Sequence, residues 1–197
     1  AWPSDFERTT AAHCVYVTDS DLELLAKGGL TVAHCGEMAG KRGQFPPMKE
    51  FADRGIRFCI GTDWVTMDPW TSMRASIIGD RMMGCTLADM NAHVALRKMT
   101  IEPARHLGLG DQIGSLEVGK QADLIMVDRK KPSMMPLAND PVATLVYNAN
   151  WNDVCFVMVA GETLIRDGQL TFADERQILE DGQAVADEIY AQVPGLQ

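Results

Sequence analysis

The stretch from Ile56 to Asp63 decides the fold, and it reads Ile-Arg-Phe-Cys-Ile-Gly-Thr-Asp. Five mostly apolar, β-prone residues lead into a glycine, a threonine and an acid, the pattern of a buried strand that ends in a carboxylate. A buried carboxylate has to be paired, hydrogen-bonded or bound to a metal, and parallel α/β proteins place their chemistry at the C-terminal ends of strands. On pattern alone, an Asp that caps the next loop or helix is the simpler explanation of the stretch, so the case for a functional Asp63 depends on the rest of the chain.

Two further β-prone runs precede this stretch. Thr9 to Tyr16 contains His13, and Leu30 to His34 ends in a histidine. A helix capped by Thr18 is predicted between them, and a second helix, from Pro46 to Arg54, is predicted before the strand at Ile56. The order strand, helix, strand, helix, strand is typical of parallel βαβ packing with right-handed crossovers.

Each of the three predicted strands ends in or near a group that can bind a metal or transfer a proton: His13, His34 and Asp63. Because the C-terminal ends of parallel strands lie at one edge of a sheet, we expect these side chains to gather around one site. A single histidine is most simply interpreted as a hydrogen-bonded core residue. Three polar groups at three successive strand ends favour a functional site instead.

The connections are predicted from local signals. A loop rich in Gly, Lys and Arg is predicted from Gly36 to Gln44. Amphipathic helices are predicted from Pro69 to Met83 and from Thr86 to Met99, followed by a short helix from Thr100 to Leu107.

From Gly108 onward the sequence becomes rich in turn-forming residues and β-prone runs. A strand is predicted from Ala122 to Val127, and Val154–Ala160 is predicted to pair with Thr163–Arg166 as a hairpin across Gly161-Glu162. A helix that begins at Asp174 ends the sequence, and its acidic face is expected to be solvated. The predicted division of the chain is 1–107, 108–172 and 173–197.

Composition limits the classes of partner. The 197 residues are 46% hydrophobic, which is enough for a sizeable core. A net charge of -9 argues against nucleic acid and anionic membranes. The sequence lacks a run of about 18 apolar residues and its first residues lack a signal-peptide pattern. We therefore expect a cytoplasmic protein without a nucleic-acid or membrane partner.

The five cysteines are scattered along the chain, which is typical of cytosolic thiols and not of a disulfide framework. Cys14 and Cys35 each follow a histidine, but the chain has no Cys-x2-Cys or His-x3-His pair, so a zinc finger is excluded. Adjacent strand residues point to opposite faces, so His13 and Cys14 are not expected to share a metal.

Four pieces of sequence carry a resemblance to a known family. They are Ala12-His13-Cys14, Val32-Ala33-His34, Gly61-Thr62-Asp63 and the run Ile113–Leu124, which reads Ile-Gly-Ser-Leu-Glu-Val-Gly-Lys-Gln-Ala-Asp-Leu. In this order they resemble the amidohydrolase superfamily, within it the cytosine-deaminase-like and chlorohydrolase-like group that includes S-adenosylhomocysteine deaminase, guanine deaminase and triazine hydrolases. The similarity extends from about residue 10 to residue 172.

The resemblance implies an α/β fold: the C-terminal part of a TIM (β/α)8 barrel, strands 6 to 8, plus a small β-sandwich segment and a C-terminal helix. It also implies that this chain is less than half of the protein. The family's His-x-His, its metal-binding histidine and its catalytic glutamate have no counterpart here, and a complete barrel needs at least about 200 residues. The chain alone is therefore expected to be inactive.

The resemblance further implies a metal-dependent hydrolase, a deaminase of an amino-substituted heterocycle (purine, pyrimidine, pterin or triazine), often a homodimer. A divalent metal, zinc or iron, makes water available as a nucleophile near neutral pH. Asp63 is implied to ligate the metal and take the water's proton. His13 is implied to hydrogen-bond the water or the substrate, and in two-metal relatives it is a ligand. His34 is expected to line the pocket, while Trp64 and Trp70 are candidates for stacking on a flat ring.

Two alternatives stay open. In the first, the protein is still a metal-dependent hydrolase, but its substrate is a cyclic amide or a chloro-triazine. The second is a non-catalytic barrel relative without a metal, in which Asp63 is structural. The loops after His34 and Asp63 depart from the family pattern, where many relatives carry Asn-Pro and Asn pairs, so the chemistry is expected to carry over more readily than the substrate.

Overall fold

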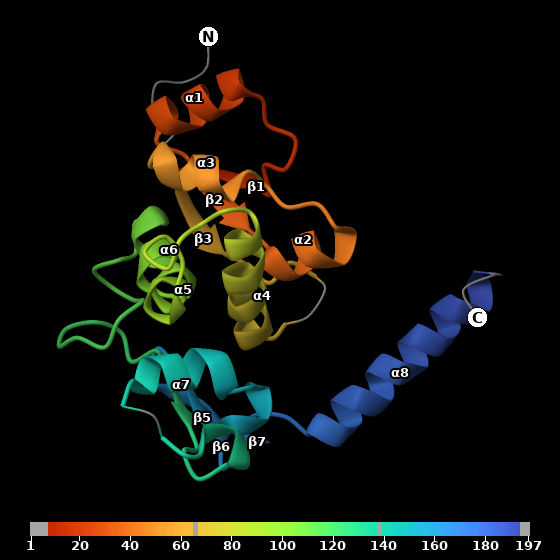
Figure 1. Cartoon of the computed structure of the whole chain (residues 1–197). Coiled ribbons are helices and arrows are strands. Elements are labelled where there is room, and N and C mark those ends of the chain that lie inside the picture. The colour runs from red at the N-terminus through yellow and green to blue at the C-terminus, as the bar shows by residue number, and fades with distance from the viewer. Residues whose placement is uncertain (1–7, 65–66, 138, 194–197) are drawn as a thin grey trace.

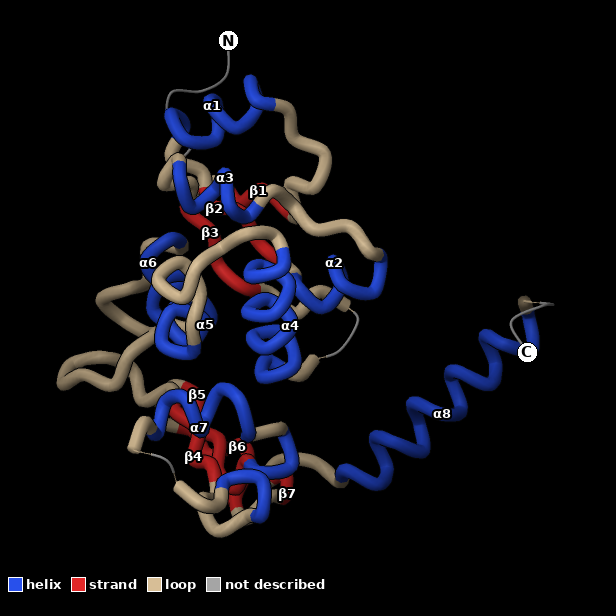
Figure 2. Tube along the Cα trace, in the orientation of Figure 1, coloured by secondary structure: helices blue, strands red, loops and turns tan. Residues whose placement is uncertain are grey.

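The computed structural model of the chain describes residues 8–64, 67–137 and 139–193. Its first sheet is parallel and has the strand order β1-β2-β3. The strands are β1 (Thr10–Ala12), β2 (Thr31–His34) and β3 (Arg57–Ile60). Ala12 is paired with Ala33 and His34 with Ile60, so the three strands end at the same edge of the sheet, as predicted (Figure 2).

Two crossover helices connect these strands, α1 (Asp19–Gly28) and α3 (Met48–Asp53). At the start of α1, Thr18 Oγ1 accepts a hydrogen bond from the Asp21 amide, and the Asp21 carboxylate accepts one from the Thr18 amide. This capping box satisfies amides that have no partner inside the helix. Gly29 ends α1 in the left-handed region, with φ 67°. The predicted order of β1, α1, β2, α3 and β3 is confirmed, although β1 is shorter than the predicted run from Thr9 to Tyr16.

The segment predicted as a loop from Gly36 to Gln44 is instead a helix, α2 (Gly36–Arg42), and the prediction was wrong here. Its first turn is buried, including Met38 and Ala39, and it packs against α4 (Pro69–Met82). Gly43 ends α2 with φ 65°. Burial against a distant helix stabilises this short segment, and local propensity does not reveal such a contact.

Helix α4 begins where the Asp68 carboxylate accepts hydrogen bonds from the Trp70 and Thr71 amides. Two helices follow, α5 (Ala92–Met99) and α6 (Ile101–His106). The helix that was predicted to begin at Thr86 begins instead at Ala92. Thr86 and Asp89 form a separate hydrogen-bonded turn, and the side chain of Asn91 caps α5 through the Val94 amide.

The second half of the chain contains an antiparallel sheet with the strand order β4-β5-β6-β7. Its strands are β4 (Leu124–Val127), β5 (Val154–Val159), β6 (Glu162–Arg166) and β7 (Gln169–Leu170). The predicted hairpin of β5 and β6 is confirmed, but its turn consists of Ala160 and Gly161, both at positive φ. Two such residues give a turn whose twist matches that of the strands.

Three short helices connect β4 to β5, and all were missed by the sequence analysis: η1 (Pro132–Met134), α7 (Pro141–Asn148) and η2 (Trp151–Asp153). Helix α7 packs against α4 and α5. Met134 and Val146 consequently share one hydrophobic core with Val32, Phe51 and Ile77 from the first half. The predicted boundaries after residues 107 and 172 stay predictions.

The last element is α8 (Glu175–Gln192); a helix was predicted to begin at Asp174, and the Asp174 side chain caps the observed helix. Figure 1 shows that it extends away from the rest of the chain, and none of its described residues is buried. Ile178, Val185 and Ile189 are all exposed. Within the described residues, no helix combines the length and the apolar character that a membrane span requires.

Candidate functional site

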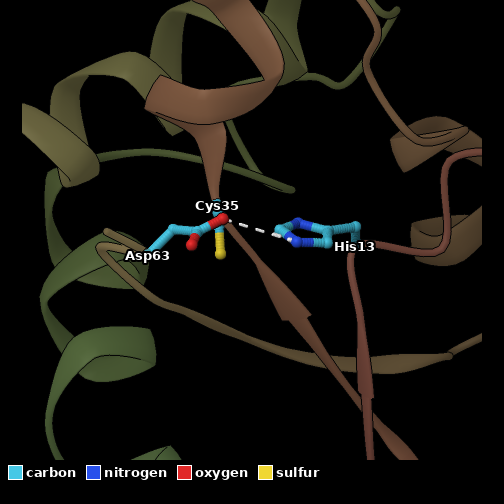
Figure 3. A group of neighbouring side chains, drawn as sticks. All are labelled: His13, Cys35 and Asp63. Carbon is cyan, nitrogen blue, oxygen red and sulfur yellow. Dashed lines mark ion pairs between the residues drawn. The ribbon is translucent and has the colours of Figure 1, made fainter. Parts of the chain in front are cut away.

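Three side chains meet at the C-terminal edge of the parallel sheet. His13 directly follows β1, Cys35 directly follows β2, and Asp63 lies three residues beyond β3. A ring nitrogen of His13, Sγ of Cys35 and a carboxylate oxygen of Asp63 all lie within 4.8 Å of one another (Figure 3). Of the three side chains predicted to gather, His13 and Asp63 meet here, whereas His34 is not in this cluster and Cys35 is an additional member.

The backbone at two of these positions is left-handed. His13 has φ 62° and Asp63 has φ 55°. Histidine and aspartate tolerate this region better than most residues, but it still costs on the order of 1–3 kcal/mol at each position. Neighbouring strands hold both segments: the His13 amide donates to the Ala33 carbonyl at 3.0 Å, and the Gly61 amide donates to the His34 carbonyl at 2.9 Å. The strand edge therefore fixes where these two side chains point.

The two carboxylate oxygens of Asp63 have different partners. Oδ2 lies 3.4 Å from Nε2 of His13, whereas Oδ1 accepts a hydrogen bond from the Trp64 amide at 2.8 Å. The His13 side chain is 42% exposed and that of Asp63 is 19% exposed. The pair is held in a defined geometry and is still accessible to a ligand from solvent.

Cys35 is a member of the site that the sequence analysis missed. Its thiol is buried, and this burial, together with the negative charges of Asp63 and Cys59, raises its pKa to about 11. The thiol accordingly carries its proton near neutral pH when no cation is present. The signal that could have identified it is its position, because Cys35 immediately follows a strand that ends beside two other predicted site residues.

A pocket of about 370 Å³ adjoins this cluster. His13 and Cys35 line it, together with Tyr16, Met38 and Arg42. Asp63 is not among its lining residues. The cluster therefore lies at one side of a pocket that carries aromatic, apolar and cationic side chains.

His34 borders the same pocket, but its side chain is only 1% exposed. Its Nε2 lies 3.0 Å from Oδ1 of Asp80 on α4, and its ring meets that of Phe58 edge to face. The structure gives His34 a buried carboxylate partner, which supports a role in holding β2 against α4. Its predicted contact with a substrate stays untested.

The two tryptophans lie in different environments. Trp64 is 73% exposed beside Asp63, which is compatible with contact with a ligand. Trp70 is 4% exposed and belongs to the hydrophobic core. Such burial does not fit a side chain that stacks on a substrate ring, and packing is the role that the structure gives Trp70.

The donor atoms of the cluster suit a divalent cation. Imidazole nitrogen, thiolate sulfur and carboxylate oxygen are the ligand types of zinc. The 3.4 Å separation of His13 Nε2 and Asp63 Oδ2 equals, within error, the roughly 3.3 Å between two such ligands of a tetrahedral zinc ion.

Comparison with known proteins agrees with this geometry. The model of the amidohydrolase family matches residues 4–164. The chain belongs to the amidohydrolase family. Within that family, it is 38% identical over 189 residues to a 5-methylthioadenosine/S-adenosylhomocysteine deaminase of Moorella thermoacetica, and this match covers 93% of the chain and 41% of the relative. It is also 32% identical to a 5'-deoxyadenosine deaminase of Methanosarcina mazei, over 93% of the chain and 43% of that relative.

Solved structures of the amidohydrolase family show the same fold. An adenosine deaminase from Xanthomonas campestris with bound zinc has a TM-score of 0.84 and 30% identity, over 94% of this chain and 43% of that one. An atrazine chlorohydrolase from Arthrobacter aurescens complexed with zinc has a TM-score of 0.76 and 22% identity, over 92% and 41%. The fold is therefore TIM-barrel-related α/β, and the chain spans about two fifths of the length of the relatives that it matches.

Proposed function

We propose that the protein is a metal-dependent hydrolase that deaminates an amino-substituted heterocycle. The observation that carries this proposal is the approach of His13 and Asp63 to 3.4 Å at the C-terminal edge of a parallel sheet. Family membership supports it, because the relatives at 30–38% identity named above are deaminases and one of them was solved with zinc.

We infer that an amino-substituted purine is the substrate class. The relatives at 30% identity or more are named as deaminases of adenosine, 5'-deoxyadenosine, methylthioadenosine or S-adenosylhomocysteine. All four compounds carry the exocyclic amino group of adenine. The pocket beside His13 offers Tyr16 and Arg42 as polar partners for the rest of such a molecule.

His13 and Asp63 have distinct roles in the proposed reaction. A divalent cation, for which zinc fits the donor set best, supplies the Lewis acid that activates water near neutral pH when it is bound. Asp63 helps to hold the cation, and its Oδ2 accepts a proton from the attacking water. Nε2 of His13 hydrogen-bonds that water or the substrate and stabilises the developing charge. The Trp64 amide holds Oδ1 and thereby fixes the orientation of the carboxylate.

The architecture of the complete protein is also part of the proposal. Residues 1–107 supply strands 6 to 8 of a (β/α)8 barrel, residues 108–172 part of a β-sandwich, and residues 173–197 a C-terminal helix. The open three-stranded sheet and the 41–43% coverage of the relatives support this division. We expect the complete enzyme to be a cytoplasmic homodimer that acts on a small molecule.

Replacing Asp63 with Asn tests the function directly. In the full-length protein, Asp63→Asn keeps the fold but removes the proton acceptor and weakens the hold on the cation, so ammonia release from 5'-deoxyadenosine is expected to fall by several powers of ten. His13→Ala is expected to lower kcat and kcat/KM together, because an interaction made in the transition state is lost.

Asp19→Asn is a suitable control, because the Asp19 side chain is 90% exposed on α1 and belongs neither to the cluster of His13, Cys35 and Asp63 nor to the lining of the pocket. It should leave the rate unchanged. Activity of Asp63→Asn within about tenfold of the parent, or roughly 1.4 kcal/mol in barrier, would contradict the assigned role. A parent protein that neither binds metal nor releases ammonia would support the non-catalytic alternative.

A further inference from the structure

We propose that Arg42 determines substrate specificity by binding an anionic group, a carboxylate or a phosphate, on the part of the purine substrate that points away from the reacting amino group. The proposal rests on the proposed function for the purine and for the place where it reacts. It goes beyond that function because it assigns a residue outside the cluster of His13, Cys35 and Asp63. It also divides purine substrates into a preferred anionic class and a disfavoured neutral class.

The pocket beside His13 is built from two connections that follow strands of the parallel sheet. Its lining residues belong to 12–17, at the end of β1 and beyond, and to 34–46, which include α2. In TIM-barrel enzymes, such connections at the C-terminal ends of the strands form the substrate site. The volume of about 370 Å³ is within the usual range for ligand pockets. A substrate that reacts beside His13 therefore has room to extend into this pocket.

Arg42 is the cation of this pocket that is available to a ligand. The described residues give its guanidinium neither an ion pair nor a hydrogen bond. The neighbouring Lys41 does not line the pocket, and its Nζ lies 2.9 Å from Oε1 of Glu37. A guanidinium binds a carboxylate or a phosphate through two parallel hydrogen bonds. In a protein with a net charge of -9, such a local cation is what makes an anionic substrate favourable.

A second donor lines the pocket together with Arg42. The hydroxyl of Tyr16 donates a hydrogen bond to Oε1 of Gln44 at 2.6 Å. Because this bond occupies the amide oxygen, Gln44 offers its amide nitrogen, which is a donor, to a ligand. Both Arg42 and Gln44 line the pocket. A guanidinium and an amide nitrogen suit the oxygen atoms of an anion better than a neutral alkyl or thioether group.

The backbone of Arg42 is held in place by the packing of α2. The first turn of this helix is buried against α4, and Gly43 ends the helix directly after Arg42 with φ 65°. The Arg42 side chain itself is exposed. A binding group on a rigid element discriminates between ligands more sharply than one on a mobile loop. The substitution of an exposed side chain at the end of a helix also leaves the fold intact, which makes Arg42 suitable for mutation.

Deamination of two matched pairs of compounds tests the assignment in the full-length protein. S-adenosylhomocysteine and methylthioadenosine are both thioethers, but only the first carries a carboxylate. Adenosine 5'-monophosphate differs from adenosine by its phosphate. In the parent, kcat/KM is expected to be at least about tenfold higher for the anionic member of one pair, and that pair identifies the anion.

Arg42→Gln should lower kcat/KM for this anionic compound by about 10- to 100-fold, the usual effect of losing a hydrogen-bonded charge. The loss should come through KM, because the contact is remote from the reacting amino group and equally strong in the ground state and the transition state. The neutral compounds should change less than about twofold. If Arg42 only stabilised α2, anionic and neutral compounds would be affected alike.

Two further variants serve as controls. Arg54→Gln removes the same charge directly after α3, where Arg54 pairs with Asp19 and does not line the pocket. It should leave both the preference and kcat unchanged. Arg42→Lys keeps the charge but loses the planar pair of donors, so it should restore part of the preference.

Equal kcat/KM values within both pairs in the parent, or an equal loss on all four compounds in Arg42→Gln, overturn the proposal and leave the proposed function standing. Isothermal titration calorimetry with S-adenosylhomocysteine and adenosine 5'-monophosphate separates the two levels of inference. An inactive parent whose binding of either compound is weakened about tenfold by Arg42→Gln keeps the role of Arg42 and removes the deaminase assignment. An inactive parent whose binding is unchanged by the substitution overturns both.

Discussion

At the scale of residues, burial decides how much each of two histidine–aspartate contacts contributes to the free energy of unfolding. His34 Nε2 lies 3.0 Å from Asp80, and His93 Nε2 lies 2.9 Å from Asp140. The first pair is almost fully buried, whereas the second is about half exposed. Removing one member of a buried pair leaves the other polar group without compensation, but solvent screens an exposed pair.

We therefore expect His34→Ala to destabilise the protein by about 3–5 kcal/mol, because it leaves the Asp80 carboxylate buried without its partner. His93→Ala is the matched control and should change the free energy of unfolding little. Urea unfolding of both variants measures the difference. Equal effects of the two substitutions would show that the buried contact does not hold β2 against α4.

At the scale of elements, the contact between α2 and α4 depends on a glycine, which has no side chain to separate the two helices. A Cβ added at Gly36 would lie 2.6 Å from the Cα and the amide nitrogen of Ser76. Real Cβ atoms do not approach a backbone so closely, so any larger residue would push the two helices apart. Because Gly36 directly follows Cys35, this packing also determines where the thiol lies.

Gly36→Ala is accordingly expected to destabilise the protein by roughly 1–3 kcal/mol, the usual range for overpacking. Gly182→Ala is the control: Gly182 lies within α8, and an added Cβ there meets no atom within 4 Å. The control should be neutral or slightly stabilising, because alanine favours a helix over glycine. Thermal unfolding followed by circular dichroism compares them, and a neutral Gly36→Ala would refute the close approach of α2 and α4.

At the scale of the whole molecule, the parallel sheet is open. Both outer strands, β1 and β3, have one unpaired edge among the described strands, and α8 exposes Ile178, Val185 and Ile189. Unpaired strand edges and apolar faces promote association. In the relatives the matched region is only about two fifths of the chain.

Residues 1–197 expressed alone should therefore be inactive and aggregation-prone, or depend on a complementary N-terminal piece for solubility. Size-exclusion chromatography and an ammonia-release assay check this expectation. A stable monomer that deaminates 5'-deoxyadenosine by itself would contradict it. Recovery of activity on mixing with the N-terminal part of a close relative would support it.

The sequence by itself determined the three strands, their order with α1 and α3, and the meeting of His13 with Asp63. These features follow from local signals: β-prone runs, the capping box at Thr18, and the rule that parallel strands end at one edge. The hairpin of β5 and β6 was likewise predictable, because two β-prone runs and the turn between them lie within one short segment.

Only the tertiary structure decided the rest. Helix α2, the burial of His34 against Asp80, the place of Trp70 in the core and the entry of Cys35 into the site were not predicted. Each depends on contact with a segment far away in the chain, and the free energy of burial comes from that distant surface. A local pattern records which residues are apolar or polar, but packing between elements decides which of them meet.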